Sequence, residues 1–149
     1  MTTESAVFDT LKYRVEVDEF GTRRYYNSAG DLHRDEGPAV EFVDKSERWF
    51  QDGLCHREDG PAIVLANGNK EWYLNGRRHC ADGPAVDAAN GYKEWHLHDK
   101  LHRTDGPAVI HEDGTKEWWI HGVQYDSEQD YHTQLKAQDI PHDNRISGV

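Results

Sequence analysis

A 23-residue repeat constrains the fold of this chain more than any other feature of its sequence. The tripeptide Gly-Pro-Ala recurs at that interval, followed each time by Val or Ile, with its glycine at Gly37, Gly60, Gly83 and Gly106. The same period separates the histidines His33, His56, His79 and His102, and the tryptophans Trp49, Trp72, Trp95 and Trp118, which we call the histidine column and the tryptophan column. Several residue types that share one period indicate an array in which each unit packs on its neighbours.

Two turns in each unit predict a pair of short strands, so that each unit is a β-hairpin. Asn-Gly or Asp-Gly dipeptides occur at residues 67–68, 90–91 and 113–114. Such dipeptides accept positive φ at low cost and favour a tight two-residue turn. The second turn carries a glycine three residues before the histidine, except that Asp99 stands there before His102. After the histidine, the proline of each Gly-Pro-Ala restricts φ where the next strand begins.

These features predict an all-β fold, an elongated antiparallel sheet of repeated hairpins. Alternation along residues 71–74 directs Trp72 and Leu74 to one face and Glu71 and Tyr73 to the other. The tryptophan column is therefore expected to form the spine of one face. In the first unit we expect Tyr26 to take the place of tryptophan.

The ends of the chain differ from the repeat, so three segments are expected. Residues 1–20 hold an N-terminal strand in which Tyr13, Val15 and Val17 alternate, and residues 21–126 form the repeat array. Residues 127–149 contain a short capping helix and a polar tail. The helix is expected because the residues from Ser127 to Asp130 resemble a capping box, and it should run through Tyr131 and Leu135 toward Ala137.

The 23-residue unit, with its Asn-Gly turn, its tryptophan and its Gly-x-x-His, resembles a divergent MORN repeat from about Gly21 to Asp126. This resemblance implies hairpins laid side by side in a long twisted sheet. After the histidine the chain departs from the usual His-Gly-x-Gly and continues His56-Arg57-Glu58-Asp59-Gly60-Pro61-Ala62. Repeats of this second kind resemble those of bacterial, phage and large DNA virus proteins. That likeness implies, as one form of binding function, a phage-type inhibitor of a host defence or regulatory protein.

Charge restricts the class of partner. The 149 residues include 28 acidic and 17 basic side chains, for a net charge of -11. Phosphate-rich surfaces would be repelled, so we expect no nucleic-acid or membrane partner, and a protein with a basic or mixed-charge surface suits the chain better. No apolar run is long enough to span a membrane, and the first residues lack the pattern of a secretory signal. With only two cysteines, the expected location is the cytoplasm.

The repeated histidines and aspartates are expected to be structural, with no catalytic residue, metal or cofactor. An active site is normally unique, whereas His-x-x-Asp recurs with the repeat. Equivalent residues one repeat apart should lie roughly 9.6 Å from each other, too far to share one zinc ion. We expect each histidine to pack at its turn and to bond locally, with Asp59, Asp82 or Asp105 as candidate partners. Cys55 and Cys80 are expected to be free structural thiols.

Variation within the repeat predicts a contact surface. The residue after each tryptophan is large but changes along the array, and a repeat protein tends to vary its binding face. The candidate partner-binding residues are Phe50, Tyr73, His96 and Trp119, together with Asp59, Asp82 and Asp105. The alternative is that both faces are partly covered, by sheet curvature or by self-association, and a homodimer would supply that cover.

Three functions remain open at this point. We favour a non-enzymatic protein-binding scaffold or inhibitor. A second hypothesis is an acidic mimic of nucleic acid, although Arg34, Arg57 and Arg103 interrupt its acidic rows. Its carboxylates would be Glu36, Asp59, Asp82 and Asp105. A third is a small-ligand binder or enzyme, which ranks last because a single-layer sheet offers few enclosed pockets.

Overall fold

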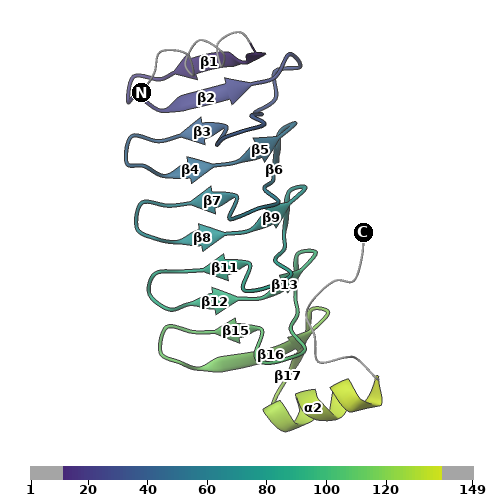
Figure 1. Cartoon of the computed structure of the whole chain (residues 1–149). Coiled ribbons are helices and arrows are strands. Elements are labelled where there is room, and N and C mark those ends of the chain that lie inside the picture. The colour runs from purple at the N-terminus through teal and green to yellow at the C-terminus, as the bar shows by residue number, and fades with distance from the viewer. Residues whose placement is uncertain (1–11, 139–149) are drawn as a thin grey trace.

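The computed structural model describes residues 12–138, which form an elongated stack of short strands closed by a helix (Figure 1). Strand β1 lies at one end of the stack and the helix α2 (Glu128–Ala137) at the other. The first residues of the expected N-terminal segment, 1–11, and the expected tail, 139–149, lie outside the described residues.

One antiparallel sheet of eleven strands runs the length of the stack. In spatial order its strands are β1 (Arg14–Val17), β2 (Arg23–Tyr26), β3 (Val40–Glu41), β4 (Glu47–Arg48), β7 (Ile63–Val64), β8 (Lys70–Glu71), β11 (Val86–Asp87), β12 (Lys93–Glu94), β15 (Val109–Ile110), β16 (Lys116–Ile120) and β17 (Val123–Tyr125). The register repeats from unit to unit: Glu71 pairs with Ile63 on one side and with Val86 on the other. The predicted all-β fold, an elongated antiparallel sheet of hairpins, is confirmed.

In three units the second turn forms a small hairpin of its own beside this sheet (Figure 1). These side hairpins are β5 (Phe50–Gln51) with β6 (Leu54–Cys55), β9 (Tyr73–Leu74) with β10 (Arg77–Arg78), and β13 (His96–Leu97) with β14 (Lys100–Leu101). Their turns have positive φ at both central residues, as at Asp52 and Gly53, which suits the strand twist of a two-residue turn. Neighbouring hairpins also bond to each other: the Gly76 N–H donates to the Cys55 carbonyl at 2.8 Å.

The side hairpins exist because the strand is interrupted at tryptophan. Trp49 lies between β4 and β5; its N–H donates to the Ala62 carbonyl at 2.7 Å, and its carbonyl accepts the His56 N–H at 3.1 Å. Both backbone groups therefore bond within the unit while the chain leaves the main sheet. The prediction of two strands per unit holds for the main sheet but misses this hairpin. Ala62 is fully buried, as are its equivalents Ala39, Ala85 and Ala108.

The Asn-Gly turns differ from the expected two-residue form. At Asn67-Gly68 only the glycine has positive φ, 93°. The Asn67 Oδ1 accepts the Asn69 N–H at 3.0 Å, and the Leu65 N–H bonds the Asn69 carbonyl at 2.9 Å. The loop therefore holds three residues and ends with a left-handed glycine, a common hairpin loop of that length. The asparagine side chain stabilises this loop, so the dipeptide marks the turn correctly but not its type.

Tyr25, and not Tyr26, takes the place of tryptophan in the first unit. Tyr25 is 4% exposed, and its N–H donates to the Ala39 carbonyl at 2.8 Å, as the N–H groups of Trp49, Trp72 and Trp95 do to their alanines. The first unit has one more residue in its second turn, which is closed by the Gly30 N–H on the Asn27 carbonyl at 3.1 Å. Because of this insertion, the residue equivalent to tryptophan lies 24 positions before Trp49, at Tyr25, and not 23 positions before it, at Tyr26.

The predicted C-terminal cap is confirmed. Ser127 is the N-cap of α2, and its Oγ accepts the Asp130 N–H at 3.1 Å. Tyr131 and Leu135 are buried against Ile120 of the last strand pair. The Tyr131 ring lies 5.0 Å from the Trp118 ring, so the helix covers the last member of the tryptophan column.

Candidate partner-binding surface

An arginine lies over the aromatic ring in three units. The guanidinium carbon of Arg57 is 3.8 Å from the centre of the Trp49 ring, and that of Arg103 is 4.0 Å from the Trp95 ring. In the first unit Arg34 lies 4.0 Å from the Tyr25 ring. Such cation–π contacts contribute about 0.5 to 2 kcal/mol, the more so where water is excluded. The arginine is therefore part of the repeat's packing.

The Asp-Gly-Pro segment surrounds the arginine. In the unit of Trp49, Arg57 Nε donates to Asp59 Oδ1 at 2.9 Å and Nη1 donates to the Pro61 carbonyl at 3.3 Å. A methyl group on Gly60 would lie 3.0 Å from the guanidinium carbon, so only glycine leaves room for the flat group. Arg103 has the same partners, Asp105 at 2.6 Å and Pro107 at 3.2 Å. We call the ring, aspartate, glycine and proline carbonyl of a unit its arginine site.

Asp59 and Asp105 therefore bond arginine and not, as expected, histidine. Sequence reasoning treated these arginines only as interruptions of an acidic row. The constant spacing of eight residues from Trp49 to Arg57 and from Trp95 to Arg103 was visible, but spacing alone does not show which side chains touch.

The histidine column closes the turn of the next unit. His56 Nδ1 accepts the Asn75 N–H at 3.0 Å, and His33 and His102 accept those of Asp52 and His121 at the same distance. The donors are first residues of the two-residue turns, where φ is positive. Packing of histidine at a turn is confirmed, but its partner is a backbone amide nineteen residues on. For His102, burial lowers the pKa to about 4, with His121 as a smaller cause.

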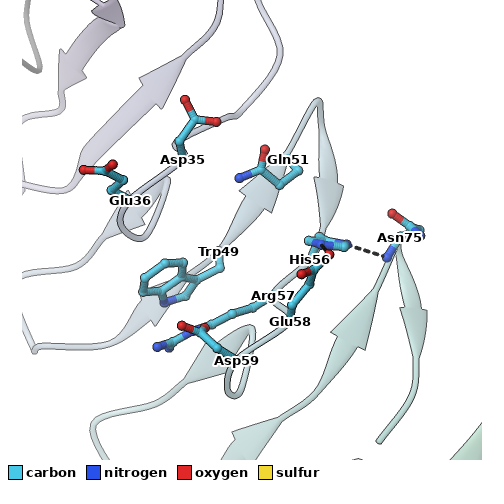
Figure 2. A pocket seen from close by; sticks show the side chains of 9 residues that line it. All are labelled: Asp35, Glu36, Trp49, Gln51, His56, Arg57, Glu58, Asp59 and Asn75. Atoms are coloured by element: carbon cyan, nitrogen blue, oxygen red, sulfur yellow. Dashed lines mark hydrogen bonds and ion pairs between the residues drawn. The ribbon is translucent and has the colours of Figure 1, made fainter.

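An open acidic groove lies between the loops of the first two units (Figure 2). Its volume is about 700 Å³. Asp35 and Glu36 line one side, Glu58 and Asp59 line the other, and the Trp49 ring lies between them.

The groove is negatively charged at neutral pH. Four carboxylates face one guanidinium, that of Arg57. Hydrogen bonds from Lys12 and then Tyr13 lower the pKa of Asp35 to about 2, and the hydrogen bond from Arg57 lowers that of Asp59. The Glu58 side chain is 83% exposed and Glu36 is exposed as well, so their charge is available to a partner, whereas the Asp59 carboxylate bonds Arg57.

Around Trp72 the side chains alternate, because Trp72 and Leu74 line one hollow whereas Tyr73 bonds Glu71. Three of the predicted aromatic contact residues bond a glutamate two residues earlier in the sequence. Tyr73 Oη donates to Glu71 at 3.0 Å, Trp119 Nε1 donates to Glu117 at 2.8 Å, and His96 Nε2 lies 2.8 Å from Glu94. The His96 bond is the largest cause that lowers the pKa of Glu94, to about 2. His96 is only 7% exposed, and Phe50, Tyr73 and Trp119 are half-buried.

The structure does not bring the seven predicted contact residues together. The aromatic group lies on one face, whereas Asp59 and Asp105 belong to arginine sites on the tryptophan face. Asp82 lies beside Trp72 in the hollow of the third unit. A role of either group in binding stays a prediction, and so does self-association.

Neither cysteine forms a disulfide, as expected: Cys55 and Cys80 are both free and half-buried. Burial raises the pKa of the Cys55 thiol to about 11, so this thiol is protonated and weakly nucleophilic at neutral pH. In the described part of the chain, no three His, Cys, Asp or Glu side chains are placed to hold a metal ion.

The sequence matches no protein-family model and no curated protein. The likeness to MORN repeats therefore stays a prediction of family, while the hairpin array itself is what the structure shows. Between residues 12 and 138, the structure contains no helix of the length and apolarity that a bilayer crossing needs.

Proposed function

We propose that this protein is a non-enzymatic binding module. It docks a protein partner by binding a basic surface of that partner. The observation that carries the proposal is the acidic groove, in which exposed carboxylates flank a tryptophan ring. Lysine and arginine side chains of a partner can pair with the exposed carboxylates of Glu36 and Glu58. A partner whose own activity uses that basic surface would be inhibited by docking.

The roles of the polar side chains support binding over catalysis. The histidines His33, His56 and His102 accept backbone amides, and Asp59 and Asp105 hold arginines, so these groups are engaged in the repeat itself. The groove is open, which suits the protruding side chains of a protein better than an enclosed small molecule.

Nucleic-acid mimicry is a weaker alternative. A mimic needs rows of uncompensated negative charge, but Arg57 and Arg103 bond the aspartates Asp59 and Asp105 in two of the units. Two of the four carboxylates assigned to the mimic are thus paired with a cation.

The proposal is tested by capture and titration. The immobilised protein is exposed to a lysate, and each captured protein is purified and titrated by calorimetry against wild type and against Glu36→Gln/Glu58→Gln. These side chains are exposed and line the groove, so the variant removes charge without disturbing the packed arginine sites. We expect a direct protein complex that is weakened severalfold by the variant and moderately by salt.

The aromatic face supplies the matched control. Tyr73→Ala/Trp119→Ala tests the other predicted surface, and loss of binding there with no effect of the groove variant would move the interface to the opposite face. Affinity that falls steeply with salt and is competed by DNA would favour mimicry. Failure to recover any direct protein complex would contradict the proposed function.

A further inference from the structure

The third unit lacks the arginine that the first, second and fourth units carry. Cys80 stands where Arg34, Arg57 and Arg103 stand in their units. Among the described residues, no Lys or Arg side chain lies over the Trp72 ring, whereas Tyr25, Trp49 and Trp95 each have one. A hollow of about 370 Å³ is present at this place, lined by Trp72, Cys80 and Asp82.

The rest of the arginine site remains in that unit. Trp72 offers its ring, and Asp82 and Pro84 stand at the positions of Asp59 and Pro61, whose oxygens accept from Arg57. Glycine is also kept, since Gly83 stands at the position of Gly60 and Gly106. A methyl group on Gly83 would meet only Cys80 Sγ, at 3.9 Å, because no guanidinium lies against it.

Charge in the hollow favours a cationic donor. Glu58, Asp59 and Asp82 line it, with Arg57 as the cation among them. His79, also in the lining, is 7% exposed, and its ring stacks on that of His98 at 5.0 Å. The neighbouring Arg57 does not preclude a second guanidinium, because Arg34 and Arg57 occupy adjacent units of the same array.

We infer that the hollow over Trp72 is a guanidinium-binding site that takes an arginine side chain of the protein partner. The assignment of the guanidinium to a partner rests on the proposed function, while the site itself rests on the two occupied copies at Trp49 and Trp95 and on the variant copy at Tyr25, where Glu36 stands in place of the aspartate. A planar guanidinium can stack on the ring and donate from its edge to Asp82 and the Pro84 carbonyl at once. A lysine ammonium cannot reproduce this flat, forked contact.

The site is tested by NMR titration of the ¹⁵N-labelled protein. The probes are N-acetyl-arginine amide, which resembles an arginine within a protein, free L-arginine, and N-acetyl-lysine amide. We expect saturable shifts of the Trp72 indole N–H and of the Asp82 and Gly83 amides with the blocked arginine, and at least about tenfold weaker binding of the blocked lysine.

Two variants separate binding from folding. Gly83→Ala places a methyl where the guanidinium would lie, in a position where the free protein has room for it. Cys80→Arg supplies the missing arginine from the chain itself. Both should lose the shifts with the blocked arginine and keep the amide spectrum of the folded array, and Cys80→Arg should also raise the thermal midpoint.

The outcomes are distinct. Absence of localised shifts in wild type, or equal shifts in Gly83→Ala, overturns the guanidinium site even if a protein partner is captured. Binding of free L-arginine without the blocked form overturns the assignment to a protein side chain. With a captured partner in hand, Gly83→Ala should weaken that complex about tenfold or more, and an unchanged affinity would place the partner elsewhere.

Discussion

Glycine occurs in this repeat for two different physical reasons. At Gly60 and Gly106 the reason is space, because the guanidinium carbon lies 3.0 Å and 2.9 Å, respectively, from a Cβ built there. At Gly68, Gly91 and Gly114 the reason is backbone conformation, because φ lies between 83° and 93°. The two kinds respond differently to the same substitution.

For the first kind, Gly60→Ala should lower the free energy of unfolding by about 1 to 3 kcal/mol, because the methyl displaces the Arg57 guanidinium from the Trp49 ring. Gly83→Ala, at the same repeat position over Cys80, should change it by less than about 0.5 kcal/mol. Urea unfolding followed by circular dichroism measures both. Equal losses would show that space for arginine is not why these glycines are present.

For the second kind, Gly91→Ala should cost about 1 kcal/mol although no atom lies within 4 Å of its Cβ position, because the backbone is left-handed there. The reciprocal change is Lys45→Gly. Lys45 has φ of 72° at the same place in the first loop, so glycine should stabilise by about 0.5 kcal/mol or more. Thermal unfolding checks the pair: the midpoint should fall in Gly91→Ala and rise in Lys45→Gly, and a change in the same direction in both would contradict this explanation.

At the scale of the elements, each unit has a sheet part and a side hairpin joined at the tryptophan. The histidine column ties one hairpin to the turn of the next through a hydrogen bond. Because His102 is 4% exposed, this bond is made by a neutral imidazole, and the connection between hairpins responds to acid.

The folded pKa of His102, about 4, lies below its ordinary value of 6.5. The unfolded chain therefore binds the proton more readily, so the contribution of His102 is complete above pH 6.5 and is lost as the pH falls toward 4. The loss should be on the order of 2 kcal/mol. His102→Asn keeps an acceptor for the His121 N–H but does not titrate, so its stability should fall less over this range. Parallel pH profiles for the two proteins would contradict the assignment.

At the scale of the whole molecule, the array is held by contacts between neighbours and needs its ends covered. Helix α2 covers the last unit, where Tyr131 lies on Trp118 and donates its hydroxyl to the Arg103 carbonyl at 2.8 Å. The tyrosine thus covers a ring that no arginine of its own unit covers. In a repeat array, loss of a cap is felt first in the unit next to it.

Leu135→Ala should therefore lower stability by about 2 to 5 kcal/mol, because this side chain is 1% exposed in the cluster with Ile120 and Tyr131. Leu54→Ala, at a leucine that is 50% exposed, is the matched control and should cost less than about 0.5 kcal/mol. Hydrogen exchange should show the loss of protection concentrated in β16 and β17. Uniform loss over the eleven-stranded sheet would indicate that the cap stabilises the array as one cooperative unit.

The sequence by itself determined the repeat, the antiparallel hairpin sheet, the face of each tryptophan and the capping helix. These features depend on local turn preferences, on alternation and on a capping box at Ser127, all of which are short-range. It predicted the acidic character of the surface but not the groove beside Trp49, since a groove depends on how two loops 23 residues apart stand side by side.

Only the tertiary structure decided which side chains meet. The insertion that places Tyr25 in the tryptophan column, the arginine over three of the rings and the histidine bond to the next turn all join residues whose contact depends on the bend at tryptophan. The empty arginine site at Trp72 became recognisable only once the occupied sites were seen. The physical reason is that a spacing along the chain is converted into a distance in space only when the direction of the backbone at each turn is known.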